Sequence, residues 1–283
     1  MLLLHKQLNT RLKCIMGVLL LSMQNIASSE VLFSNDIESG TLNNIFFDVN
    51  TFDGVTVDIS SDFAHSGTKS IKIGYPVDEA GLQIQIAPFT STPTLFTRKY
   101  EYYAPGWEGN WPVGLKTGRY FSKPDFTTTG GYAYMSEKLI WQGYDSPCNE
   151  DYAKGMNNAI YNLDLVSWYG STKLFGNGLP YIRTGHWYKF ETWIVMNSAV
   201  DATDGVLKIW VDNNLVYSKT NVVWRSSSRG TPNGAGWQSM WFGGNYSGAV
   251  CGAPSQTLYR YIDDLYVSTT LDLDVRPNPP TLY

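Results

Sequence analysis

Cationic and phenolic side chains gather in one part of this sequence, between residues 114 and 141. The segment 114–121 contains Lys116 and Arg119 together with Gly114 and Gly118, and glycine permits a ligand to approach the backbone closely. The segment 132–141 has the period of two that is typical of a β-strand, so every second side chain projects from the same face. The side chains on that face are those of Tyr132, Tyr134, Ser136 and Lys138. A single face then carries phenols, a hydroxyl and an ammonium group.

Such a set suits β-elimination on a polysaccharide that contains uronic acid. The reaction removes the C5 proton next to a carboxylate, and positive or hydrogen-bonding groups must neutralise the charge that develops. A tyrosine or a lysine can accept that proton, and a tyrosine can protonate the leaving glycosidic oxygen. The scheme needs no metal and no cofactor. On residue pattern alone, the alternative is a solvated sheet face on which Glu137 and Lys138 are ordinary surface charges.

The composition indicates a folded all-β domain. Only 16% of the 283 residues are charged and 14% are aromatic, whereas a coiled coil, a disordered tail or a nucleic-acid binder needs a charge-rich or basic surface. Short runs rich in β-branched and aromatic residues recur between turn formers, without a sustained helical period. The segments expected to form strands are 70–74, 82–86, 100–107, 132–141, 187–196, 206–211, 215–217, 241–244 and 261–267.

Two of these segments, 187–196 and 206–211, predict adjacent antiparallel strands. Asp212 and the two asparagines after it supply the turn into a third strand. Neither an internal repeat nor a break in composition divides the chain after residue 29. We therefore expect one two-sheet sandwich domain over residues 30–270, followed by a proline-rich tail over 271–283.

Residues 1–29 have the pattern of a signal peptide. Basic residues precede the apolar run 14–23, and small residues follow at 27–29, where we expect cleavage after Ser29. The run is shorter than the roughly 20 residues that span a bilayer. We therefore expect a secreted or periplasmic protein without stable membrane insertion; the alternative is an uncleaved membrane anchor.

Cleavage would leave 18 basic against 25 acidic residues, a net charge of −7, because the first 29 residues hold three cations and no acid. Nucleic acid is therefore not an expected partner. An anionic polysaccharide can still bind if the cations gather in one cleft, since distant exposed charges are screened. The two remaining cysteines, Cys148 and Cys251, predict one disulfide in an oxidising compartment. We expect structural roles for His65 and His186, which lie in turn-like sequence.

Three segments occur in a characteristic order: Trp107 after a tyrosine-rich strand, then Gly114-Leu-Lys116, then Ser136-Glu-Lys-Leu-Ile-Trp141. This order resembles polysaccharide lyase family 14, the alginate and glucuronan lyases, which have a concanavalin-like β jelly roll. Similar segments in the second half are 185–187, 196–197, 204–212, 223–225, 241–244 and 261–264. The second half is shared by many jelly-roll proteins and bears on the fold rather than on the chemistry.

The resemblance implies roles for particular residues. Lys116 would neutralise the carboxylate or transfer a proton, Ser136 and Lys138 would hold the uronate, and Tyr161 would act as acid or base. The residue pattern adds Arg119 and Tyr134 as further substrate contacts.

The sequence departs from the family in several places. Lys138 stands where the family usually has arginine, which removes the two-pronged grip on a carboxylate but keeps the charge. The Pro-Gly after the loop lysine is missing, and an insertion spans 142–158. Tyr161 alone represents a pair of tyrosines, with Tyr152 as a weaker candidate. These departures bear on the choice of uronate and on catalysis.

Two other functions fit an all-β sandwich. A retaining glucanase needs two carboxylates about 5 Å apart on one strand face, whereas Glu101, Glu137 and Glu191 stand alone in strand-like sequence. A non-catalytic carbohydrate-binding domain or adhesin would keep aromatic residues along a groove without needing Lys116 or Tyr161. The tryptophans expected beside the cleft are Trp107, Trp111 and Trp141, and those expected in the core are Trp187, Trp193 and Trp210.

Overall fold

The computed structural model describes residues 30–51, 54–76, 80–86, 88–107, 115–123, 133–140, 152–153, 155–162, 165–167, 173–174, 182–227, 236–243, 245–246 and 256–273. The chain divides into two units, residues 1–30 and 31–283, and every strand below belongs to the second. The predicted signal segment, Cys148 and Cys251 lie outside the described residues.

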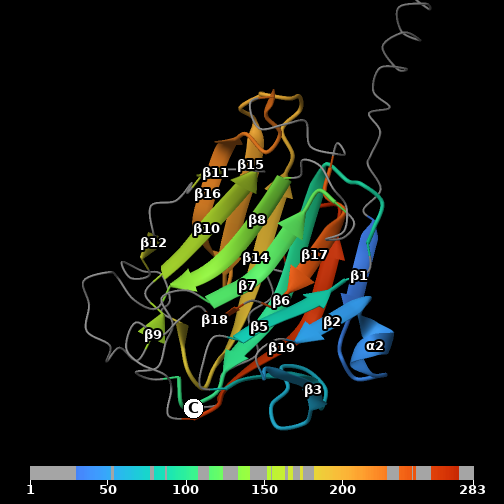
Figure 1. The fold of residues 1–283 in the computed structure, drawn as a ribbon, viewed down its shortest axis with the longest axis vertical. Coiled ribbons are helices and arrows are strands. Elements are labelled where there is room, and N and C mark those ends of the chain that lie inside the picture. The colour runs from blue at the N-terminus through green and yellow to red at the C-terminus, as the bar shows by residue number, and fades with distance from the viewer. Residues whose placement is uncertain are drawn as a thin grey trace, which may run out of the picture. The chain divides into compact units, whose positions relative to one another are not determined.

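Within the described residues, eight strands form one antiparallel sheet, called sheet A (Figure 1). Its members are β1 (Val31–Asn35), β3 (Thr56–Ser60), β4 (Ser70–Tyr75), β6 (Thr94–Tyr103), β14 (Trp187–Val195), β15 (Gly205–Val211), β16 (Asn214–Val222) and β19 (Leu258–Ser268). They pair in the order β16-β15-β14-β6-β19-β4-β3, and β1 pairs with β19.

Nine strands of the described residues form sheet B. They are β2 (Asp48–Thr51), β5 (Ala80–Gln85), β7 (Leu115–Phe121), β8 (Ala133–Ile140), β10 (Gly155–Asn162), β11 (Leu165–Ser167), β12 (Lys173–Leu174), β17 (Ser239–Phe242) and β18 (Asn245–Tyr246). The main order is β11-β10-β8-β7-β17-β5-β18. A small pair, β9 (Tyr152–Ala153) and β13 (Ile182–Arg183), and the short helix α2 (Leu42–Ile45) complete the described elements.

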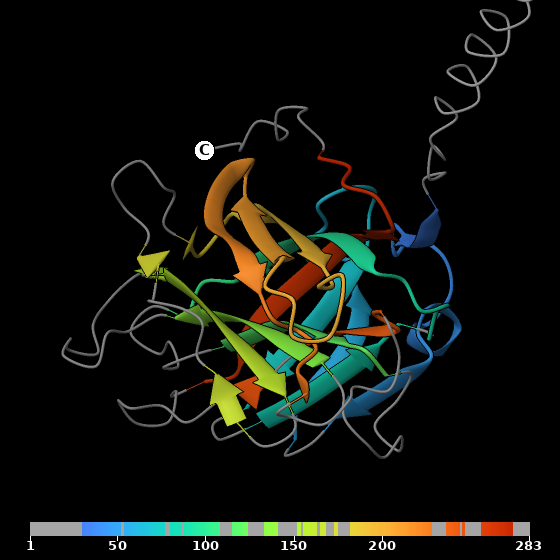
Figure 2. The same cartoon turned by 90° about the horizontal axis from the view of Figure 1, so that it is seen from above.

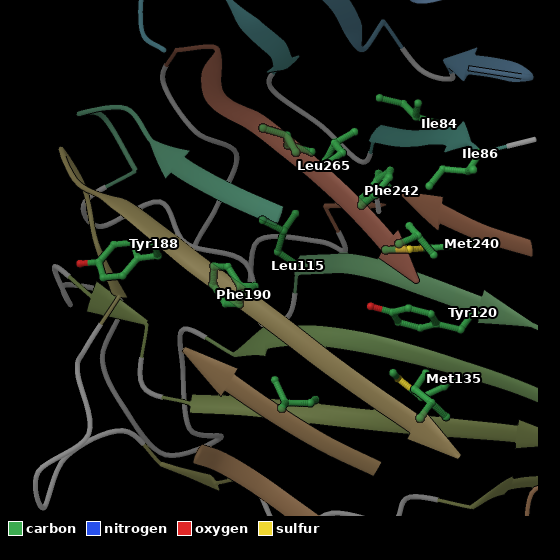
Figure 3. Packing of buried hydrophobic residues seen from close by; sticks show 14 of the residues in the cluster. Ile84, Ile86, Leu115, Tyr120, Met135, Tyr188, Phe190, Met240, Phe242 and Leu265 are labelled. Carbon is green, nitrogen blue, oxygen red and sulfur yellow. The ribbon is translucent and has the colours of Figure 1, made fainter. Parts of the chain in front are cut away.

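The hydrophobic core contains inward side chains of both sheets, whose layering is visible from above in Figure 2. Figure 3 shows Leu115, Tyr120 and Met135 of sheet B and Phe190 of sheet A among the side chains of this core, and all four are buried. Alternation along each strand produces this arrangement, because every second side chain faces the opposite sheet. The chain is therefore an all-β jelly roll, as the sequence predicted.

The expected strand pair over 187–196 and 206–211 is confirmed as β14 and β15, which pair antiparallel. Asp212 and Asn213 form the turn into β16 with φ angles of 47° and 67°. Asparagine and aspartate tolerate this left-handed conformation better than most residues, which is why the turn could be recognised.

The prediction for the tryptophans is wrong in part. Trp107, expected beside a cleft, is fully buried and packs edge-on against Tyr75 and Tyr103. Trp187 and Trp193, expected in the core, are half-buried. Trp210 is buried as expected, and Trp224 and Trp237 belong to the core cluster. Trp111 and Trp141 lie outside the described residues.

The loop over residues 61–69 covers the outer side of β6. Phe63 stacks on Tyr102 with ring centroids 4.6 Å apart, and His65 stacks on Tyr100 at 3.6 Å. His65 Nδ1 lies 2.5 Å from a carboxylate oxygen of Asp264. These contacts agree with the structural role expected for His65.

The inner side of β6 carries charge into the interior. Lys99 and Glu101 form an ion pair at 2.9 Å, and Lys99 also lies 3.1 Å from Glu137 on β8. Arg260 on β19 lies 2.7 Å from Glu101. We call these four buried residues the ion-pair cluster. Because two cations face two carboxylates, the formal charges balance, as buried ionic groups require.

Glu101→Gln should test the ion-pair cluster. The substitution leaves Lys99 and Arg260 with one carboxylate fewer, and breaking a buried ion pair costs about 3–5 kcal/mol. We expect a loss of this size in the free energy of unfolding, measured with urea. Asp62→Asn is the control, because the Asp62–Lys72 pair is exposed and should contribute little. Equal effects of the two substitutions would contradict the role of the cluster.

The same variant should change the pH dependence of stability. Burial raises the pKa of Glu101, but Arg260, Lys99 and the Tyr103 hydroxyl outweigh it and hold the pKa below the ordinary value of 4.5. Folding therefore favours the ionised carboxylate. The stability that Glu101 contributes should be complete above about pH 4.5 and should be lost as the pH falls through its lowered pKa. Urea denaturation of the parent protein and of Glu101→Gln, at pH values above and below 4.5, measures the difference in unfolding free energy.

Candidate functional site

Three neighbouring strands, β7, β8 and β10, carry all six residues that the sequence singled out (Figure 1). Their registers form three cross-strand pairs. Lys116 lies opposite Lys138, Arg119 lies opposite Ser136, and Tyr134 lies opposite Tyr161. Directly opposed positions of an antiparallel pair share one face of the sheet, with Cβ atoms about 4.5–5.5 Å apart.

The buried neighbours identify which face this is. Met135 and Glu137 of β8 are buried, and Glu137 contacts Thr192 of sheet A, so these two positions face the interior. Positions 134, 136 and 138 alternate with them and belong to the outer face of sheet B. The side chains of Lys116 and Arg119 are half-buried. Six polar positions thus gather on one outer face.

The role expected for a glycine in segment 114–121 needs correction. Residues 115–121 form strand β7, and Gly118 faces the interior. A Cβ atom on Gly118 would lie 2.8 Å from Glu137 Oε2 and 3.3 Å from Lys99 Nζ. The missing side chain therefore makes room for the ion-pair cluster rather than for a ligand.

Glu137 makes hydrogen bonds on the inner face of sheet B. Its carboxylate accepts hydrogen bonds from the Tyr120 hydroxyl at 2.6 Å and from the Thr192 hydroxyl. Burial, followed by the charge of Glu137, raises the pKa of Tyr120 well above its ordinary value of 10.0. Tyr120 therefore stays protonated and serves as a donor to Glu137, not as an acid or base for a substrate.

The structure also corrects the expectations for the glutamates. Glu137 is not a surface charge, and Glu101, Glu137 and Glu191 are each at most 1% exposed. They do not stand alone, because Glu101 and Glu137 share Lys99 and Glu191 binds Arg98 at 2.8 Å. Carboxylates enclosed in this way cannot flank a glycosidic bond, which argues against a retaining glucanase.

An aromatic pair on the same sheet escaped the sequence reasoning. The rings of Phe121 and Trp241 have centroids 4.7 Å apart, and Trp241 lies opposite Arg119 in the β7–β17 register. Both rings are buried. The alternation of Trp241 with core residue Phe242 was a usable signal, because it assigns the two to opposite faces. Tyr152, the weaker tyrosine candidate, lies on β9, which pairs with β13.

The described residues contain no group of three or more His, Cys, Asp or Glu side chains placed to hold a metal ion. No helix among the described residues is long and apolar enough to cross a membrane.

Comparison with known proteins identifies the architecture. No protein-family model and no curated protein sequence matches the chain. Among solved structures, an endo-β-1,4-glucuronan lyase from the fungus Trichoderma reesei matches with a TM-score of 0.54 and 16% identity, over 85% of this chain and 96% of that one. The alginate lyase vAL-1 from Chlorella virus matches with a TM-score of 0.55 and 17% identity, over 85% and 100%.

A third structure, the marine PL-14 alginate lyase from Aplysia kurodai, has a TM-score of 0.51 and 16% identity, over 86% of this chain and 98% of that one. The chain has the jelly-roll fold of alginate and glucuronan lyases. The predicted resemblance is thus confirmed at the level of this lyase fold, which extends over most of the chain.

Gly118→Ala should disturb the junction between β7 and the ion-pair cluster. The added methyl group would meet Glu137 and Lys99, which are held by buried partners, so we expect a loss of about 1–3 kcal/mol in unfolding free energy. Gly185→Ala serves as a comparison, because nothing lies within 4 Å of its Cβ position. Its only expected cost is the backbone strain of a non-glycine residue at a φ of 79°. Urea denaturation measures both. A fully stable Gly118→Ala protein would contradict the packing of Glu137 behind β7.

Proposed function

We propose that this protein is a secreted polysaccharide lyase that cleaves a uronic-acid polysaccharide of the alginate or glucuronan type by β-elimination. The observation that carries the proposal is the set of three cross-strand pairs on β7, β8 and β10. They bring cations, a hydroxyl-bearing residue and two tyrosines to one outer face. The lyase fold gives independent support, since proteins of this fold include enzymes named for alginate and glucuronan.

The proposed reaction balances without a cofactor. Lys138, Arg119 and Ser136 would hold the uronate carboxylate, and Lys116 would neutralise the charge that develops when the C5 proton leaves. Tyr161 would exchange protons with the sugar as base or acid, with Tyr134 as a further contact. The C5–H bond and the bond from C4 to the glycosidic oxygen break, a C4–C5 double bond forms, and the leaving oxygen gains a proton.

Export is part of the same proposal. Residues 1–29 would direct the chain out of the cytoplasm, where its polymeric substrate is encountered, and Cys148 and Cys251 would form a disulfide there. The expected partner is the anionic polysaccharide, held by cations on an otherwise acidic protein.

A non-catalytic carbohydrate-binding role is the second candidate. It is favoured by Lys138, which stands where the family's usual arginine would grip a carboxylate with two hydrogen bonds. A binding domain would need neither Lys116 nor proton transfer by Tyr161. The two candidates therefore differ in turnover rather than in affinity.

A polymer panel should separate the candidates. The unsaturated product of elimination absorbs in the ultraviolet, so we expect absorbance to rise with alginate, glucuronan or a related polyuronate. Lys116→Ala and Tyr161→Phe should each lower the rate by about a hundredfold or more, because each removes a group that handles the developing charge or a proton. Lys208→Ala and Tyr259→Phe, both on sheet A, are the matched controls and should retain the parent rate.

Two outcomes would count against the assignment. Binding of the polymers without any rise in absorbance would favour the carbohydrate-binding role. Turnover that survives in folded Lys116→Ala and Tyr161→Phe proteins would leave the lyase activity in place but reject these two residues.

A further inference from the structure

Strand β7 contains one more residue than its partner requires. Lys116 lies opposite Lys138 and Gly118 lies opposite Glu137, so Thr117 is the extra residue of a β-bulge. Such a bulge bends the strand and changes the direction of the side chains around it.

The bulge decides which face Lys116 and Arg119 share. The two residues are three positions apart, and in a regular strand side chains three apart point to opposite faces. The extra residue removes one step of the alternation, because Lys116 and Arg119 oppose Lys138 and Ser136, which are two apart. Both cations thereby belong to the outer face of sheet B.

The interior supplies the partners that the bulge needs. The Thr117 carbonyl accepts a hydrogen bond from Lys99 Nζ at 2.5 Å and another from Arg260 at 3.4 Å. The Thr117 hydroxyl donates to Glu137 at 3.3 Å. Thr117 is fully buried, and a buried carbonyl without a partner would be costly.

We propose that Lys99 is a positioning residue for the outer face, because it holds the Thr117 bulge and so keeps Lys116 and Arg119 on one side of sheet B. The proposal rests on the proposed function for its catalytic consequence, since Lys99 itself is buried and reaches no substrate. Its geometric content, that the bulge depends on Lys99, stands independently of any activity.

The test compares Glu137→Gln with the double variant Lys99→Met/Glu137→Gln. The single variant keeps Lys99 on the Thr117 carbonyl but unbalances the buried charge. The double variant restores the balance of charge, with Arg260 facing Glu101, and removes the Lys99 contact. Removing the Lys99 hydrogen bond has a cost, but an unbalanced buried charge costs more, so we expect the double variant to unfold at no lower temperature than the single variant.

The double variant should nevertheless be less active than Glu137→Gln. Displacement of Arg119 and Lys116 should lower kcat/KM on the cleaved polyuronate by about tenfold or more in the double variant relative to Glu137→Gln. Adding Arg119→Ala should then lower kcat/KM much less than it does in the single variant, because Arg119 already lies out of place. If Lys99 contributed only to stability, the variant with the higher melting temperature would also have the higher kcat/KM. Arg119→Ala would then lower kcat/KM equally in both variants.

Crystal structures of the two variants provide the readout that needs no activity. We expect the β7–β8 register around Thr117 to shift in the double variant and to be retained in Glu137→Gln. An unchanged bulge in the double variant would overturn the proposal, whatever the kinetics. A lost bulge in a protein whose parent cleaves no polyuronate would support the geometric inference while rejecting the lyase function.

Discussion

The ion-pair cluster between the two sheets is the interaction on which the rest of the structure depends. Lys99 connects both carboxylates, Glu101 on its own strand and Glu137 on the facing sheet. Burying four charges carries a large desolvation cost, which the ion pairs among two cations and two carboxylates offset, although Nη1 of Arg260 is buried without a hydrogen-bond partner among the described residues. Apolar residues could fill the same space, but they would leave the Thr117 carbonyl without its donor. The cluster therefore ties the interior to the strand that presents Lys116 and Arg119.

Much of the sandwich could be predicted because its signals are local. Strand alternation and turn residues lie within a few positions of each other, as in β14, β15 and the turn at Asp212 and Asn213. The types of residue at the candidate site could be predicted for the same reason. Their pairing across β7, β8 and β10 agrees with the strand assignment made for 132–141.

The polar interior could not be predicted, because long-range partners determine it. Along β6, charged Lys99 and Glu101 alternate with aromatic Tyr100 and Tyr102, a pattern typical of a strand whose charged side meets water. The structure shows the opposite arrangement, since the loop over residues 61–69 covers the aromatic side. The charged side faces Glu137 and Arg260, which are distant in the sequence. The bulge at Thr117 could not be predicted either, because residue spacing within one strand does not reveal its register with the partner strand.

The register of β7 and β8 places two lysines, Lys116 and Lys138, at directly opposed positions. Like charges at directly opposed positions of two strands repel each other and weaken the pairing. An anionic chain lying across β7 and β8 would relieve this repulsion, so its binding would tighten the sheet that receives it. If the outer face binds an anionic polymer as proposed, occupancy of that face and resistance to unfolding would be coupled.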